Sequence, residues 1–319
     1  MNMHKATTFD DGFASQLAAP ARLLAGLASE MRPKQWIKNL TCLAGLVFSG
    51  QLFDVTAVAM AWVGFAAFCA ASSSIYILND LVDLHVDRCN PRTRTRPLAS
   101  GDLPVWLAVA ASICLAIVSL FTAGSLNLAC AVVLTMYLLL NVLYSTHLKH
   151  AVIADVMCIA LGFVLRVLLG VYAVQVLPTA WIVICMFFLA IFLGFAKRKS
   201  ELSNAEGDAS LIRPVLTQYT APLLDILLAM SATTAIVCYG LFTVTSSRNP
   251  TLIVTVVPVA FCVMRYLLHV IVHGKGDSPE TILMSDKPLW LGIAAWLVLC
   301  VGILYGEIHL FAEVSAWAP

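Results

Sequence analysis

Nine apolar segments, each of a length that suits a membrane-spanning helix, follow one another between Ile37 and Glu307. A helix needs about 20 mostly apolar residues to cross a bilayer, because lipid offers the backbone no hydrogen-bond partners. The chain is 61% hydrophobic and 12% charged, whereas soluble domains carry about 25% charged residues. We therefore expect an all-α membrane protein with about nine transmembrane helices. The predicted spans are Ile37–Phe53, Val55–Leu81, Pro104–Ala123, Leu126–Tyr144, Val152–Val174, Trp181–Ala196, Pro222–Val244, Leu252–Val272 and Leu289–Glu307.

The loop cations predict the orientation in the membrane, because cytoplasmic loops are enriched in Lys and Arg. With the N-terminus in the cytoplasm, only Arg248 among the loop cations falls on the opposite side. We therefore expect a multi-pass protein of the inner (plasma) membrane whose N-terminus and active site face the cytoplasm. The net charge of +1 gives no reason to expect a nucleic-acid partner. The expected cytoplasmic cations are Lys34, Lys38, Arg88, Arg92, Arg94, Arg96, Lys149, Lys197, Arg198, Lys199, Arg213, Lys275 and Lys287.

Residues 1–30 are expected to form a cytoplasmic tail, and residues 31–319 a transmembrane catalytic domain. Leu17, Leu24 and Met31 recur at helical spacing in and just after the tail, which favours a short helix on the membrane surface. A disordered tail is equally compatible with this sequence.

An aspartate motif follows the second predicted span. On a helix, Asp80, Asp83 and Asp87 would lie within about 60° of one another and share one face. Three adjacent carboxylates repel one another unless a cation is present, and Mg²⁺ binds through a few carboxylates together with substrate phosphates. We therefore predict that the three aspartates are catalytic and hold Mg²⁺ together with Asn79; the alternative is an ordinary solvated helix end.

Cations stand close to this motif in the sequence. Arg88, Arg94 and Arg96 follow the aspartates directly and are candidates for binding phosphate oxygens in a bidentate manner.

A second polar cluster surrounds the start of the fifth predicted span. It contains Tyr144, Lys149, Asp155 and, about three helical turns further on, Arg166. An arginine at that depth is costly unless it faces a cavity or a partner, so we expect Arg166 to hold a phosphate or to orient Asp155. Pairing with a polar group on another span is the structural alternative.

A third cluster ends the sixth predicted span. Lys197 and Glu201 are at i and i+4 and could pair, and Arg198 adds a second cation. Anchoring by positive charge alone would also explain these cations. Together with the first two clusters, these residues make a basic rim around an acidic centre, which suits a polyphosphate with Mg²⁺. Three further candidates for substrate binding stand at the start of the first span: Lys34, Lys38 and Asn39.

These motifs resemble the UbiA-type intramembrane prenyltransferase superfamily. The pattern Asn79-Asp80-x-x-Asp83-x-x-x-Asp87, followed by Arg96-Pro97-Leu98-x-x-Gly101, is similar to the first aspartate motif of that superfamily. The resemblance covers essentially the whole membrane region. It implies nine helices around a central cavity that opens sideways to lipid for a polyprenyl chain.

One branch of the superfamily, the decaprenyl-phosphate phosphoribosyltransferases, is the most similar. The second aspartate-rich motif of the aromatic prenyltransferases has no clear counterpart, since Asp155 stands alone. The branch resemblance implies Mg²⁺-dependent transfer of ribose 5-phosphate from phosphoribosyl diphosphate (PRPP) to polyprenyl (decaprenyl) phosphate, which supplies arabinose donors for cell-surface glycans. It rests on Arg32-Pro33-Lys34-Gln35-Trp36-Ile37-Lys38-Asn39, Leu165-Arg166 with Gly170, Lys197-Arg198 with Glu201, Gln218-Tyr219-Thr220, Ser231-Ala232-Thr233, Cys238-Tyr239-Gly240-Leu241 and Arg265-Tyr266.

Two other functions compete with this interpretation. An aromatic prenyltransferase, which joins a prenyl diphosphate to 4-hydroxybenzoate or a similar ring, would share the fold and the first motif. A transporter would line a path across the bilayer with buried charge, but here the ionisable residues crowd one face. The sequence leaves open the polyprenyl chain length and whether the protein forms a homo-oligomer.

Overall fold

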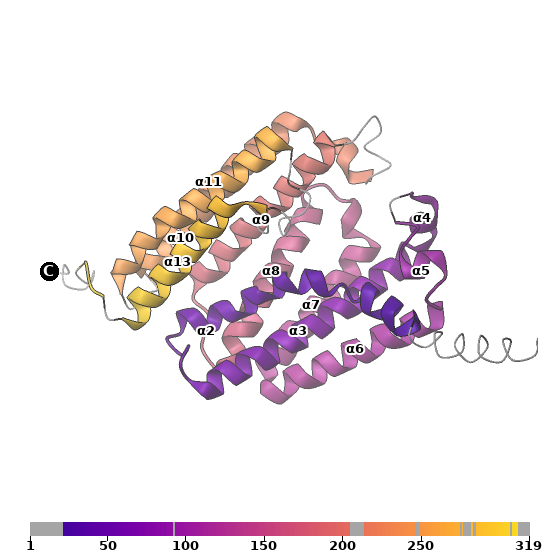
Figure 1. The fold of residues 1–319 in the computed structure, drawn as a ribbon, viewed down its shortest axis with the longest axis horizontal. Coiled ribbons are helices and arrows are strands. Elements are labelled where there is room, and N and C mark those ends of the chain that lie inside the picture. Colours follow the sequence, from indigo (N-terminus) through magenta and orange to yellow (C-terminus); the bar gives the residue numbers. More distant parts are fainter. Residues whose placement is uncertain are drawn as a thin grey trace, which may run out of the picture.

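The computed structural model describes residues 22–91, 93–204, 214–245, 249–274, 276, 282, 285–306 and 308–311. These residues form helices joined by short connections, and none of them lies in a strand. Eight helical stretches are long and apolar enough to cross a membrane (Figure 1). The prediction of an all-α, multi-pass membrane protein is confirmed. The eight stretches are α3 (Val55–Val82), α6 (Val105–Leu126), α7 (Leu128–Thr146), α8 (Ala154–Ala173), α9 (Ala180–Ser203), α10 (Ala221–Thr245), Pro250–His273 and α13 (Lys287–Tyr305). The seventh stretch consists of η5 (Pro250–Thr255) and α11 (Val256–His273).

The first predicted span is not one long α-helix. The structure places a 3₁₀ helix, η1 (Pro33–Leu43), and a short helix, α2 (Ala44–Phe48), in this region. Both lie directly against α8, because a Cβ on Gly170 would be 1.7 Å from the Cys42 carbonyl oxygen and one on Gly45 2.7 Å from the Val171 Cα. Only glycine permits such an approach of two backbones. The described part of the chain therefore has eight long spans and one broken, tightly packed segment.

Helix α8 occupies the centre of the bundle. In its most apolar stretch, 67% of the residues are buried, against 44% in α3, the next most buried span. Its first turns pack through Val156 and Ala160 against α9, in a core that residues of α10 and α11 also share, while Leu165 and Leu169 pack against α3 and α7. A polar side chain on α8 consequently lies inside the protein and away from lipid.

One end of the bundle collects the polar connections, and we call it the polar end. Helices α3, α7, α9 and α11 finish there, and α6, α8, α10 and α13 begin there, as their side-chain contacts show. The short helices α4 (Leu84–Cys89) and α5 (Pro97–Ser100) lie together at this end (Figure 1). Two 3₁₀ helices, η2 (Leu148–His150) and η4 (Pro214–Gln218), also connect spans there. The cations predicted for one side gather at this end, except Arg92, Arg213 and Lys275, which lie outside the described residues, as does Arg248.

The described part of the N-terminal tail is helical over residues 22–30. Leu23 and Leu27 pack against Leu98 and Leu103, whereas Leu24 is exposed. This amphipathic arrangement docks the helix on the domain near the aspartate motif. Its place on the membrane surface stays a prediction, and residues 1–21 lie outside the described part of the chain.

Candidate active site

The aspartate motif does not continue as one helix. Helix α3 ends at Val82, Asp83 has φ −89° and ψ 5°, and α4 begins at Leu84. Backbone bonds bridge the break, from the Asp83 amide to the Asn79 carbonyl and from the Asp87 amide to the Asp83 carbonyl, both at 2.9 Å. The bend turns Asp83 away from the face that Asp80 and Asp87 share. The expected single carboxylate face is therefore divided in two.

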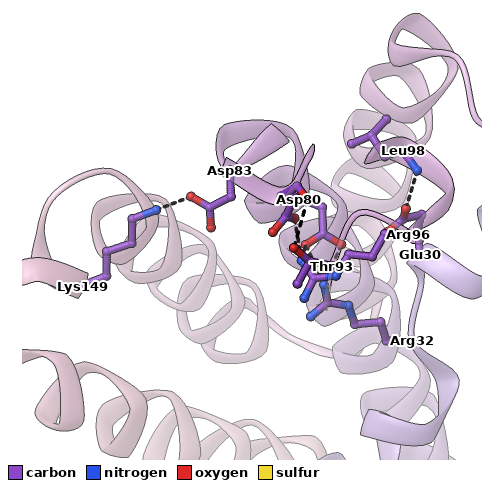
Figure 2. A network of polar contacts seen from close by, with 9 residues as sticks. Glu30, Arg32, Asp80, Asp83, Thr93, Arg96, Leu98 and Lys149 are labelled. Carbon is purple, nitrogen blue, oxygen red and sulfur yellow. Dashed lines mark hydrogen bonds and ion pairs between the residues drawn. The ribbon is translucent and has the colours of Figure 1, made fainter. Parts of the chain in front are cut away.

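Asp80 contacts two arginines, Arg32 and Arg96 (Figure 2), and Asp87 contacts Arg96. The Arg32 Nη2 lies 2.6 Å from both carboxylate oxygens of Asp80. The Arg96 Nη1 donates to Asp80 Oδ1 at 3.0 Å and to Asp87 Oδ2 at 2.6 Å. Arg32 adopts a left-handed backbone conformation with φ 52°, and its guanidinium lies 5.2 Å from the Tyr76 ring centre. These short, charge-assisted bonds compensate the burial of two carboxylates.

Lys149 reaches the third aspartate from another connection. Its Nζ donates to Asp83 Oδ1 at 2.5 Å (Figure 2), although the two residues belong to different sequence clusters. Lys149 lies in η2, between α7 and α8, so this ion pair joins the aspartate motif to the connection between α7 and α8.

Glu30 is a site residue that the sequence analysis missed. It is only 2% exposed, and its Oε1 accepts a hydrogen bond from the Leu98 amide at 2.9 Å (Figure 2). The pKa of the Glu30 carboxyl is raised to about 7. Burial is the largest cause, and a hydrogen bond with Asp80 is the second. Its position two residues before Arg32 is a weak signal, because nothing in the local pattern distinguishes it from a surface glutamate.

The second and third clusters form one buried network. Arg198 is 1% exposed; its Nε donates to Asp155 Oδ2 at 2.6 Å, and its Nη1 to Glu201 Oε2 at 2.5 Å. The Tyr219 hydroxyl donates to Asp155 Oδ1 at 2.9 Å. Arg198 was predicted to bind substrate, but its charge is engaged by two carboxylates. Lys197 remains 40% exposed on its side chain, with Nζ 3.9 Å from Glu201 Oε1.

Arg166 lies deep in the bundle and does not orient Asp155. It is 6% exposed, and its Nε donates to Asn39 Oδ1 at 2.8 Å. The rings of Phe68, Tyr137 and Phe163 surround the guanidinium, with centres at 5.1, 5.3 and 4.8 Å. Cation–π attraction thus replaces part of the lost hydration. Asn39 belongs to this deep cluster and not to the aspartate motif.

The remaining predicted site residues stand around the polar end. Lys34, Arg88 and Arg94 are exposed, and Tyr144 is half-buried at the end of α7. The Lys38 Nζ donates to Gln35 Oε1 at 2.5 Å. The structure therefore leaves several cations accessible beside the paired groups.

The carboxylates fit a hard divalent cation in part. Asp80 and Asp87 already direct one oxygen each at a single cationic atom, the Arg96 Nη1, and carboxylate oxygens are the ligands that Mg²⁺ prefers. Asp83 points to Lys149 instead. Among the described residues, no three His, Cys, Asp or Glu side chains gather as a ready metal-binding set. Two of the four predicted ligands therefore converge in this arrangement, and substrate oxygens would have to complete the coordination.

Solved structures share this architecture. A UbiA homolog from Archaeoglobus fulgidus bound to GPP and Mg²⁺ superimposes with a TM-score of 0.65 at 20% identity, over 88% of this chain and 99% of that one. A digeranylgeranylglyceryl phosphate synthase gives 0.65 at 17% identity, over 89% and 99%. These similarities establish the fold.

Sequence relatives cover nearly the same length. The decaprenyl-phosphate phosphoribosyltransferase of Mycolicibacterium smegmatis is 34% identical over 87% of this chain and 92% of its own. The protein of that name from Mycobacterium tuberculosis (strain H37Rv) is 32% identical over 87% and 94%. Residues 39–285 match the UbiA prenyltransferase family. The chain therefore belongs to the UbiA prenyltransferase family.

Proposed function

We propose that this protein transfers ribose 5-phosphate from PRPP to a polyprenyl phosphate and releases diphosphate. The observation that carries the proposal is the similarity, over most of both chains, to relatives named decaprenyl-phosphate phosphoribosyltransferase. We further propose that the product supplies arabinose donors for cell-surface glycans, and that the polar end faces the cytoplasm, where its cations belong by the positive-inside rule.

The charge balance of the aspartate motif supports a diphosphate substrate. Three cations, Arg32, Arg96 and Lys149, are paired with the three aspartates of the motif. The cluster is thus close to neutral by itself, and an added Mg²⁺ would make it attract a polyphosphate. In this proposal Asp80 and Asp87 would hold Mg²⁺, and the bound ion would stabilise the negative charge that develops on the departing diphosphate.

The cationic side chains of the protein would bind and orient the phosphate groups during the reaction. An oxygen of the acceptor phosphate attacks C1 of the ribose, the bond from C1 to the diphosphate oxygen breaks, and the diphosphate leaves with the electron pair. The acceptor is already an anion, so the site needs no strong general base. Arg96 and Lys149 would orient phosphate oxygens by charge-assisted hydrogen bonds, and positioning would supply most of the rate.

Transfer of label tests the proposal. Purified protein is incubated with Mg²⁺, polyprenyl phosphate and PRPP labelled in the ribose, and we expect label to move into the lipid phase. A parallel incubation contains a prenyl diphosphate and 4-hydroxybenzoate. Product in the second incubation alone would replace the proposal by the aromatic prenyltransferase function.

A further inference from the structure

A strained turn separates η2 from α8. Ile153 has φ 67° and ψ −45°, and the Ala154 amide donates to the Val152 carbonyl at 2.7 Å. This is a γ-turn with positive φ, a rare conformation that a β-branched residue strongly disfavours. Surrounding contacts must hold such a residue in place, and strain of this kind concentrates at functional sites.

The hydroxyl of Tyr219 holds this turn from outside. It accepts a hydrogen bond from the Ile153 amide at 2.7 Å and donates one to Asp155 Oδ1 at 2.9 Å. Tyr219 is 3% exposed, and its ring makes an edge contact with Phe195, which restricts its orientation. Because Arg198 donates a hydrogen bond to the other oxygen of Asp155, the turn is linked through Asp155 to the end of α9.

The turn lies four residues after Lys149 in the sequence. Lys149 lies in η2, just before the turn, and its ammonium group pairs with Asp83 of the aspartate motif. Tyr219 itself follows η4 on the connection between α9 and α10. The phenol thus links two connections at the polar end, and the Lys149–Asp83 ion pair joins them to the aspartate motif.

We propose that Tyr219 is a positioning residue, whose hydroxyl keeps the Ile153 turn in its strained form so that Lys149 stays at the aspartate motif. The kinetic consequence rests on the proposed function: without the hydroxyl, Lys149 no longer meets the substrate polyphosphate in the right place. A purely structural tyrosine would affect stability but would not affect phosphate recognition selectively.

The chain offers a matched control in Tyr239. Its hydroxyl is also buried and hydrogen-bonded, to the Thr255 hydroxyl at 2.7 Å, the Trp296 indole at 2.8 Å and the Cys300 sulfur at 3.8 Å. It packs in a different cluster, with Phe242, Leu252 and Cys300. Tyr239→Phe therefore removes a comparable hydroxyl without touching the turn.

The first test needs no substrate. Amide hydrogen exchange over residues 148–154 is compared in purified wild type, Tyr219→Phe and Tyr239→Phe. We expect Tyr219→Phe to accelerate exchange of the Ile153 amide by about tenfold or more, because that amide loses its acceptor. Tyr239→Phe should leave it unchanged. Unchanged exchange in Tyr219→Phe would overturn the proposal, whatever reaction the protein catalyses.

The second test is kinetic. Tyr219→Phe should raise KM for PRPP by about tenfold, with kcat much less affected, and Tyr239→Phe should not. Because Tyr219 acts through Lys149, Tyr219→Phe combined with Lys149→Met should be no worse than Lys149→Met alone. If the increases in KM caused by the two substitutions multiply in the double variant, Tyr219 does not act through Lys149 and the proposal is refuted.

Ile153→Gly provides a variant that keeps every hydrogen-bonding group. Glycine adopts positive φ without strain, so the turn should depend less on the Tyr219 hydroxyl. We expect Tyr219→Phe to raise KM for PRPP less in an Ile153→Gly background than in wild type; an equal rise in both backgrounds would overturn the proposal. If wild type does not use PRPP, the proposed function fails, and the exchange measurements still decide whether Tyr219 holds the turn.

Discussion

Lys197 and Arg198 are neighbours in sequence, but their substitution should have opposite consequences. Arg198 is almost fully buried and binds two carboxylates, at 2.6 and 2.5 Å, whereas the Lys197 side chain is 40% exposed, with its Nζ 3.9 Å from Glu201 Oε1. We therefore expect Arg198→Met to affect folding and Lys197→Met to affect substrate binding.

The magnitude for Arg198 follows from its burial. Removing one partner of a buried ion pair costs about 3–5 kcal/mol, because the other charge stays buried without compensation. Asp155, which is 0% exposed, would keep only its bond from Tyr219. Since native proteins are stable by about 5–15 kcal/mol in total, Arg198→Met should lose a large part of that stability.

Lys197→Met should have a much smaller effect on the free energy of unfolding than Arg198→Met, and a larger effect on the kinetics. An exposed i, i+4 pair contributes about 0.3–0.5 kcal/mol to folding. If Lys197 binds a substrate phosphate, its loss should cost about 1.5–3 kcal/mol of binding, which is roughly ten- to more than a hundredfold in kcat/KM for PRPP. KM for the lipid phosphate should change less.

Heating the purified variants in detergent, followed by size-exclusion chromatography, measures the stability, and initial rates of label transfer measure the kinetics. A third variant removes all three charges together: Asp155→Asn, Arg198→Met and Glu201→Gln. It should recover much of the stability lost in Arg198→Met alone. If Arg198→Met melts like wild type and only KM for PRPP rises, then Arg198 serves substrate binding and not the stability of the fold, and the reasoning fails.

Three further outcomes can be measured on the same protein. Asp83→Asn should slow label transfer by orders of magnitude without unfolding, whereas Asp102→Asn, an exposed carboxylate at the same end, should behave like wild type; chelator should abolish transfer and Mg²⁺ restore it. Arg166→Lys should lower stability by about 1–3 kcal/mol, because Lys cannot serve its buried amide acceptor and fill the aromatic cage together; an unchanged melting temperature would contradict this. Hydrogen bonds from the Arg265 guanidinium are the largest cause that holds the pKa of the Asp286 carboxyl well below its usual range. The resulting stabilisation is complete above the unfolded pKa of about 3.9 and is lost as the pH falls further, so Asp286→Asn should flatten the acid decline in melting temperature.

Apolar run lengths predicted most of the fold. The expected span Val55–Leu81 corresponds to α3, Val55–Val82, and the later seven spans also correspond to long helical stretches. This works because lipid requires every crossing to be long, apolar and helical. The exception, Ile37–Phe53, shows the limit of the rule: backbone contacts permitted by Gly45 and Gly170 decide its form, and such contacts leave no trace in local hydropathy.

The candidate site was predictable in its residue types and less so in its connections. The aspartate spacing indicated a carboxylate cluster, but the bend at Asp83 carries no Gly or Pro signal and separates that residue from the other two. Glu30 and Tyr219 belong to the site through buried hydrogen bonds to residues far away in the sequence. Sequence patterns describe neighbours within a few turns, and neither residue has its partner there.

The sequence by itself determined that the chain crosses a membrane many times and gathers its charge at one end, because both follow from the cost of placing polar groups in lipid. Only the tertiary structure decided which charges meet. Lys149 pairs with Asp83, and Arg198 with Asp155, across large sequence separations. A pairing of this kind depends on how helices pack around α8, and packing is a property of the assembled bundle that no local period in the sequence encodes.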